Sequence, residues 1–498
     1  MTSANNERKG PGFALFGLAT GAAAGLAGYA VVELWADRAA DERGPLTVFA
    51  FLAAFTAAFL LLAERKRIAW AAAPALAIAG VLAIPTWFML GAAAPEANLN
   101  EFPVRFWFLI GAPLAAYVMT TLAKAALEEG VPPGYSTVFF HGLTLPLIYA
   151  GASLFAVLAI LLLFAWAALL RAMNVDFFHN IFQEAWFILP FSGAVGGAAI
   201  AMMRGLESVL GALRFILLLF CRIAMPITAV FSLTFLLVLA TNGPAPIFEK
   251  PYPAAIMLAL AFAGMLIFNG VYQNGEGGPP PLWLRVSSIA ALIAFPVYAG
   301  LAAYALWLRI DDYGLTPPRV IGLAASGLAA AYSLVCLAGL ITEARWRGER
   351  WMPLVGQFNV VMAGAWALVL ILLATPLLDP WAMSAKSQET LLRQSRISPE
   401  EFDFGYLRFK LGAHGTRVLE RLAAIEDHPE AALIRRGAEK ALRAENRWAY
   451  ENDGRAPTPA PRDRADRPGP PTDVEDLPLN PAEPGERDAR PESEASHP

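Results

Sequence analysis

Long apolar runs, separated by short polar segments, follow one another along most of the chain. Each run is long enough to cross about 30 Å of hydrocarbon at a rise of 1.5 Å per residue. Strands of a membrane barrel would be about ten residues long with alternating polarity, so these continuous runs predict helices. They cover residues 13–35, 46–63, 69–91, 106–124, 144–170, 185–203, 223–241, 253–272, 286–308, 320–342 and 353–378.

The pattern therefore predicts an all-α, polytopic integral membrane protein with about eleven transmembrane helices. Residues 1–12 would form a cytoplasmic N-terminus, and residues 13–378 would form the helical bundle. Residues 452–498 are rich in proline and acidic residues and contain almost no large apolar ones, which predicts a disordered tail.

Residues 379–451 have the pattern of a small soluble domain built from three or more short helices. Ser398-Pro399-Glu400-Glu401 has the sequence of a helix start, Gly412 predicts the end of that helix, and Thr416 predicts the next cap. A second start signal, Asp427-His428-Pro429-Glu430, precedes the last helix. The apolar side of that helix would carry Ile434, Ala438, Ala441 or Leu442, and Trp448.

The composition agrees with a membrane protein and changes the picture little. Apolar residues make up 57% of the chain and charged residues 16%, against about 45–50% and 25% in soluble domains. The net charge of −4 comes without a dense basic stripe, so no nucleic-acid partner is expected. Cys221 and Cys336 lie in or beside expected spans, where they are interpreted as small apolar core residues.

Lysine and arginine gather in the segments that would face the cytoplasm. Residues 64–68, 204–222 and 343–351 are the basic connections, and all three lie on the N-terminal side of the membrane. The first run is too long for a cleaved signal peptide, so it is interpreted as an anchor with the N-terminus inside. An odd number of spans then places the C-terminal region outside, in the periplasm of a bacterium with two membranes.

Small residues repeat at every fourth position in two of the expected spans. They are Gly17, Gly21 and Gly25 in the first span and Gly193 and Gly197 in the sixth. Glycine lets two helix backbones approach closely in lipid. These positions therefore predict packing faces, either within the bundle or between subunits.

Residues 304–320 form a polar turn between two apolar runs, at the expected outer face. Gly314 permits the chain to reverse, and Thr316 with Pro317 predicts the start of the next helix. The alternative is a cation or substrate site. Its candidate side chains are Arg309, Asp311, Asp312 and Tyr313.

Two other polar segments are candidates for chemistry. The first outer loop carries Asp37, Asp41 and Glu42, as lipid-linked glycosyltransferases carry acidic residues there, but the spacing does not match their paired acidic motif. The segment around Asp176 and His179 is interpreted as an amphipathic interfacial helix, because its phenylalanines suit the interface and no zinc-type spacing is present.

Polar residues inside the expected spans are scarce. His141 lies at the entry of the fifth span, and Asn269, Gln357 and Asn359 are expected to form hydrogen bonds between helices. No mid-span carboxylate is evident, which argues against a proton-driven pump. No nucleotide, hydrolase or kinase signature occurs in a suitable context, so no catalytic residue, cofactor or metal is assigned.

Four motifs in the second half resemble, in this order, the bacterial polytopic membrane proteins catalogued as domain of unknown function 4153. They are Asn269–Gln273, Tyr304–Pro317, Pro376–Pro380 with Ser384–Gln388, and Phe402–Phe409. The resemblance covers roughly residues 210–430. It implies a helical protein of the bacterial inner membrane and brings no activity or functional residues with it.

Three functions are compatible with the sequence. The first is a non-enzymatic inner-membrane scaffold or envelope-associated protein, whose partners would be the bilayer and a protein bound by residues 379–451. The second is a secondary transporter or permease, suggested by the many proline-bearing spans. The third is a lipid-linked glycosyltransferase-like enzyme that uses the first outer loop.

Overall fold

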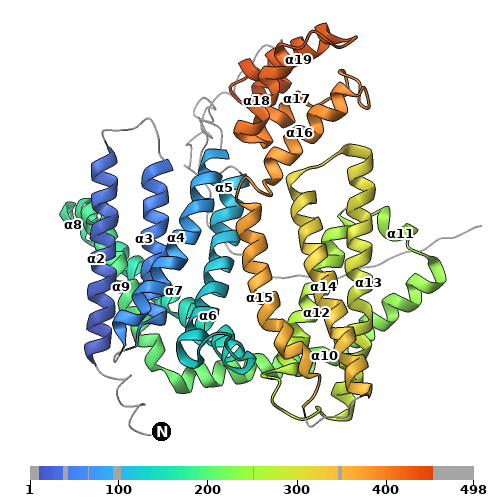
Figure 1. Ribbon diagram of the computed structural model, residues 1–498. Helices are drawn as coiled ribbons and strands as arrows, with labels where there is room; N and C mark the ends of the chain where they lie inside the picture. The colour runs from blue at the N-terminus through green and yellow to red at the C-terminus, as the bar shows by residue number, and fades with distance from the viewer. Residues whose placement is uncertain are drawn as a thin grey trace, which may run out of the picture. The chain divides into compact units, whose positions relative to one another are not determined.

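The computed structural model describes residues 11–36, 43–64, 67–92, 102–250, 252–345 and 350–452. These ranges form helices joined by short turns, and they contain no strand (Figure 1). Eleven of the described helical segments are long and apolar enough to cross a membrane. The prediction of an all-α, multi-spanning membrane protein is therefore confirmed. The predicted disordered tail falls almost wholly outside the described residues.

The first half of the bundle contains six spans. The segment α5, η1 and α6 forms a single span, with a π-helical turn at η1. The elements are α2 (Pro11–Ala36), α3 (Arg43–Leu62), α4 (Ile68–Ala92), α5 (Phe102–Phe106), η1 (Trp107–Gly111), α6 (Ala112–Glu129), α7 (Tyr135–Ala172), α8 (Phe177–Gln183) and α9 (Ala185–Gly205).

The second half contains five spans and packs on the first through contacts of α15 with α6 and α7 and of α10 with α7. Its elements are α10 (Glu207–Asn242), α11 (Ala245–Phe248), α12 (Pro253–Tyr272), α13 (Leu282–Tyr313), α14 (Pro317–Arg345) and α15 (Pro353–Leu373). Because the spans alternate, α2 begins on one side of the bundle, the N-side, and α15 ends on the other, the C-side (Figure 1).

The expectation that residues 204–222 form a connection is wrong. Helix α9 continues to Gly205, and α10 begins at Glu207 after a single non-helical residue. The early part of α10 is held against α7, because the Arg214 guanidinium lies 4.3 Å from the Phe140 ring centroid and donates to Thr144 Oγ1 at 2.8 Å. Helix α10 thus extends beyond the apolar run, and its early part makes polar contacts with α7.

Helices α2 and α9 pack more extensively than any other pair of described helices, along the glycine faces expected from the sequence. A Cβ atom at Gly21 would overlap the Gly193 backbone, and one at Gly17 would overlap the Gly197 backbone. The absence of side chains at these positions is therefore what allows the contact. The packing is within the bundle, which decides between the two alternatives for this face.

A group of short helices follows α15: α16 (Pro380–Arg393), α17 (Phe404–Lys410), α18 (Gly412–Ala423), α19 (Ala431–Arg443) and α20 (Arg447–Glu451). Ser398 starts no helix, because Asp403 caps α17 instead, and Thr416 lies inside α18. The predicted face of α19 is confirmed for Ile434, Ala438 and Ala441, which are fully buried. Trp448, on α20, is exposed.

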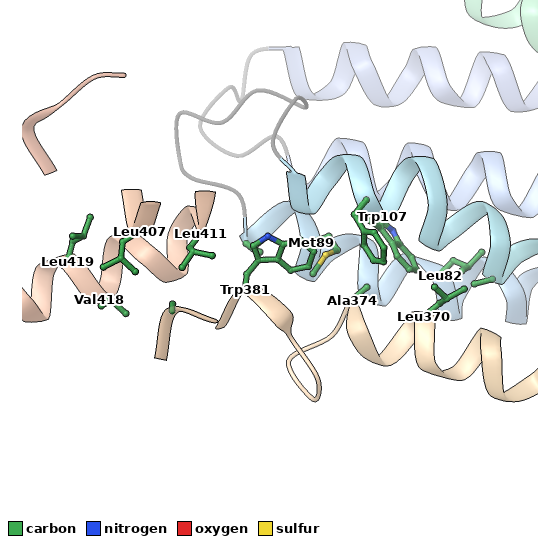
Figure 2. Close-up of a cluster of buried hydrophobic side chains, with 14 of the residues drawn as sticks. Leu82, Met89, Trp107, Leu370, Ala374, Trp381, Leu407, Leu411, Val418 and Leu419 are labelled. Carbon is green, nitrogen blue, oxygen red and sulfur yellow. The ribbon is translucent and has the colours of Figure 1, made fainter. Parts of the chain in front are cut away.

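These short helices, called the C-terminal helices below, share one hydrophobic core with the bundle. Figure 2 shows Trp381 between Leu411 of the C-terminal helices and Met89 of α4. The Trp381 side chain is fully buried, and its ring centroid lies 6.2 Å from that of Phe106. The apolar cluster therefore continues from the spans into α17 and α18, with the Trp381 side chain between them.

Candidate functional site

The polar turn between α13 and α14 has the local structure expected from the sequence. Helix α13 ends at Tyr313, Gly314 has a φ of +72°, and α14 begins at Pro317. The Gly314 N–H donates to the carbonyl of Ile310, which closes the end of α13. All four candidate side chains, from Arg309 to Tyr313, are exposed.

The backbone of this turn forms hydrogen bonds with α16 and with the residues that follow it. Arg396 Nη2 donates to the carbonyl of Asp311 at 2.7 Å, and Gln388 Nε2 donates to that of Tyr313 at 3.1 Å. The N–H of Leu315 donates to Ser387 Oγ at 2.9 Å. The turn therefore positions the C-terminal helices, and among its candidate side chains the Tyr313 ring centroid lies 5.8 Å from the Arg319 guanidinium carbon.

A cavity of about 480 Å³ lies between the two halves of the bundle. Helices α6, α7, α10, α12, α14 and α15 line it, mainly with apolar side chains. Leu217, Phe220 and Leu266 belong to the lining and are also exposed on the outside of their helices. The cavity therefore opens sideways, toward the surface that the spans present to lipid.

A chain of uncharged hydrogen bonds forms the polar part of the cavity wall. Asn359 Nδ2 on α15 donates to Asn269 Oδ1 on α12 at 2.8 Å, and Asn269 Nδ2 donates to the Tyr332 hydroxyl on α14 at 2.7 Å. The predicted interhelical bonds of Asn269 and Asn359 are thus confirmed. Gln357 is exposed and takes no part in this network.

Aromatic side chains continue this wall toward the N-side. The Tyr135 ring, at the start of α7, lies 5.8 Å from the ring of Tyr272, at the end of α12. The Tyr272 hydroxyl donates to the carbonyl of Met352 and accepts from the N–H of Gly356, both at 3.0 Å. These bonds tie the N-side ends of α12 and α15 together across the cavity rim.

Four ionisable side chains meet at the N-side ends of α3, α6 and α7. Lys124 Nζ lies 2.5 Å from Glu64 Oε1 and 3.4 Å from Glu128 Oε1, and His141 Nε2 lies 2.9 Å from Glu128 Oε2. Lys124 and His141 are only 5% and 6% exposed, respectively. The sequence singled out His141 alone, because its partners are distant in the chain or lie at span ends.

This ionisable cluster is next to the cavity. Thr121 on α6 and Gly142 on α7 both line the cavity. Lys124 follows Thr121 by one helical turn, and His141 immediately precedes Gly142. A change of charge in the cluster would therefore alter the electrostatic forces on α6 and α7, two of the helices that line the cavity.

The remaining candidates are simple to place. Asp37, Asp41 and Glu42 lie outside the described residues. Helix α8 is the helix expected around His179, whose Nε2 lies 2.9 Å from Arg171 Nη1. No group of three or more histidine, cysteine, aspartate or glutamate side chains in the described ranges is placed to hold a metal ion.

The cavity and its asparagine–tyrosine network were therefore only partly foreseeable. Asn269 and Asn359 were singled out by polarity, whereas Tyr135 and Tyr332 look like ordinary membrane tyrosines in the sequence. No family model, curated protein or solved structure matches this chain.

Proposed function

We propose that this protein is a non-enzymatic membrane protein that binds a lipid-type amphiphile in the cavity between the two halves of its bundle. The observation that carries the proposal is an apolar cavity that opens sideways between membrane-spanning helices. The hydrocarbon core of a bilayer holds lipid tails and no bulk water, so a tail is the natural occupant of such a space. The volume of about 480 Å³ falls in the range of small-molecule sites.

The network within the wall supports the same class of ligand. Asn269, Asn359 and Tyr332 satisfy one another, so the apolar space is bordered by uncharged groups. An ion entering this space would lose its hydration without meeting a countercharge. An acyl or isoprenoid chain loses nothing there and gains close contacts with the aromatic wall.

Lipid retention during purification tests the proposal. Ala363 lines the cavity on α15, so Ala363→Phe fills part of the cavity. Ala165 is exposed on α7, and Ala165→Phe adds the same side chain on the lipid-facing surface. Native mass spectrometry of the purified proteins should show bound lipid lost from Ala363→Phe and kept in Ala165→Phe. Equal retention in both variants would overturn the proposal.

The basic segments 64–68 and 343–351 support a location in the bacterial inner membrane with the N-side in the cytoplasm and the C-terminal helices in the periplasm. The four motifs quoted above support kinship with the domain of unknown function 4153. In the periplasm, the C-terminal helices would present exposed Leu433 and Trp448 to a protein partner. A phosphatase fused after Glu451 should be active outside the cell, and cytoplasmic fluorescence from a fluorescent fusion would reject this orientation.

A secondary transporter is the second candidate function, and the ionisable cluster beside the cavity favours it. Buried ionisable groups in membrane proteins mark proton and ion paths. Proteoliposomes that contain a pH-sensitive dye test this function with a broad panel of amino acids, sugars and peptides. A transported substrate must move protons in wild-type vesicles and fail to do so with Glu128→Gln.

A further inference from the structure

A second, smaller pocket lies at the N-side end of α12 and is called the N-side pocket here. Its volume is about 200 Å³. The turn that joins α12 to α13 forms one wall, with Gln273, Asn274 and three glycines, and Trp351 forms another. Unlike the cavity, this pocket has a substantially polar lining.

Two of the residues that line the N-side pocket, Arg222 and Trp351, carry side-chain hydrogen-bond donors. Arg222 of α10 lines it, and this arginine forms no ion pair with any described residue. The Nε1–H of Trp351 has no acceptor in the described part of the chain, although Trp351 is only 3% exposed. A buried donor without a protein partner is rare in native structures and is commonly satisfied by an ion or a water molecule.

The acidic group nearest in sequence lies outside the lining of this pocket. Glu276 belongs to the same turn but does not line the pocket, and it is exposed. The Glu276 N–H donates to Asn274 Oδ1 at 3.3 Å, and its carboxylate accepts from Asn274 Nδ2 at the same distance. The glycines of the turn carry no Cβ, so a ligand can approach the backbone N–H groups closely. The pocket thus has the chemistry of an anion site.

The N-side pocket and the cavity are neighbours through two helices. On α10, Cys221 lines the cavity and Arg222 lines the N-side pocket. On α12, Asn269 and Gly270 line the cavity, whereas Val271 and Tyr272 line the N-side pocket. The two spaces therefore lie one residue apart along both helices, and a molecule with a polar end and an apolar end would have to bridge only this step.

We infer that the N-side pocket binds the phosphate of an anionic glycerophospholipid of the N-side leaflet, whose acyl chain enters the cavity. This inference rests on the proposed function and names its ligand class. A guanidinium forms strong charge-assisted hydrogen bonds to phosphate oxygens. Basic pockets between membrane helices at the cytoplasmic side recognise lipid head groups in the same manner. Free phosphate shares the anionic chemistry but would leave the adjoining cavity unfilled.

The test compares the binding of phosphatidylglycerol, which is anionic, with that of phosphatidylcholine, which is zwitterionic. Native mass spectrometry of the full chain in detergent micelles gives both apparent affinities. One basic side chain contributes roughly 1 kcal/mol to anionic-lipid binding, so Arg222→Gln should reduce the preference for phosphatidylglycerol by about fivefold. Arg222→Lys should keep most of the preference because it keeps the charge.

Arg67→Gln is the matched control, because Arg67 is also exposed on the N-side and lies far from the pocket in the chain. It should leave the preference unchanged. An equal effect of Arg67→Gln and Arg222→Gln would overturn the inference, as would displacement of the lipid from the wild-type protein by excess inorganic phosphate. If Ala363→Phe loses lipid while Arg222→Gln keeps the preference, the phosphate site is wrong and the cavity proposal stands. If Ala363→Phe retains lipid, the proposed function itself fails.

Discussion

Asn269 joins three helices through the hydrogen bonds of one side chain. It accepts from Asn359 and donates to Tyr332, and its Nδ2 also lies 2.9 Å from the carbonyl of Met265 on its own helix. In lipid these groups have no water as an alternative partner. The network therefore holds the cavity wall in one arrangement, and its loss should be measurable as a change in stability.

We expect Asn269→Leu to lower the free energy of unfolding by about 1–2 kcal/mol, because interhelical hydrogen bonds in membranes contribute roughly 0.6–1.7 kcal/mol each. Unfolding of the purified protein in mixed detergent micelles measures the change. Asn180→Leu, at an exposed position on α8, should leave stability nearly unchanged. Equal effects of the two substitutions would show that the network does not stabilise the bundle.

Asp379 links the last span to the C-terminal helices. Its carboxylate accepts from the N–H groups of Trp381 at 2.9 Å and Ala382 at 3.1 Å, and it lies 2.9 Å from His414 Nε2. Burial alone would raise the pKa of Asp379. The hydrogen bond and charge of His414 and the two N–H donors outweigh burial, so its pKa lies below the ordinary value.

This lowered pKa gives the Asp379 contact a defined pH dependence. Because the folded pKa lies below the unfolded value of about 3.9, the stabilisation is fully present above that pH and is lost as pH falls through the folded pKa. Asp379→Asn should cost about 1–3 kcal/mol at pH 6 in thermal unfolding, and the difference from wild type should shrink below about pH 4. Asp427→Asn, at an exposed position, is the control. A difference that stays constant down to pH 3 would contradict the assignment.

At the scale of elements, the contact between α2 and α9 depends on the absence of side chains. Gly21→Ala places a methyl group against the Gly193 backbone, whereas Gly80 on α4 has nothing within 4 Å of the added atom. Overpacking costs roughly 1–3 kcal/mol, and alanine otherwise favours a helix over glycine by up to about 1 kcal/mol. Gly21→Ala should therefore destabilise the protein and Gly80→Ala should not, as measured by unfolding in micelles. Equal effects of Gly21→Ala and Gly80→Ala would show that the contact between α2 and α9 does not depend on the absence of a side chain at Gly21.

The turn at Gly314 attaches the C-terminal helices to the bundle. Gly314 and Gly243 have the same φ of +72°, so alanine strains the backbone equally at both positions. At Gly314 the new methyl would also lie 2.6 Å from Leu391 Cδ1 on α16, while at Gly243 nothing lies within 4 Å. Only Gly314→Ala should raise the hydrogen-exchange rate of α16. Unchanged exchange in α16 would mean that the turn does not hold that helix.

The sequence predicted the helices far better than it predicted the contacts between them. Span number follows from runs of apolar residues, because each helix must satisfy its own backbone in lipid. The glycine repeats likewise identified α2 and α9 as close-packing helices. The start at Ser398 failed because Asp403 competes as a cap. The extent of α10 was missed because Arg214 and Arg222 interrupt the apolar run.

At the scale of the whole molecule, the motifs of the second half either attach the C-terminal helices to the bundle or line the cavity and the N-side pocket. Ser387 and Gln388 bind the turn within Tyr304–Pro317, and Asp379 binds the C-terminal helices. Asn269 and Tyr272 lie in the walls of the cavity and the N-side pocket. Their convergence could not be read from the chain, because it depends on contacts between residues up to 90 positions apart.

The central claim is that a lipid chain occupies the cavity between the two halves of the bundle. An electron cryomicroscopy map of the full chain in lipid nanodiscs tests it most directly. We expect elongated density beside Trp366 and Phe262, which line the cavity, and no such density in Ala363→Phe. A wild-type map in which the cavity is empty, or is closed by movement of α10 against α15, would contradict the account.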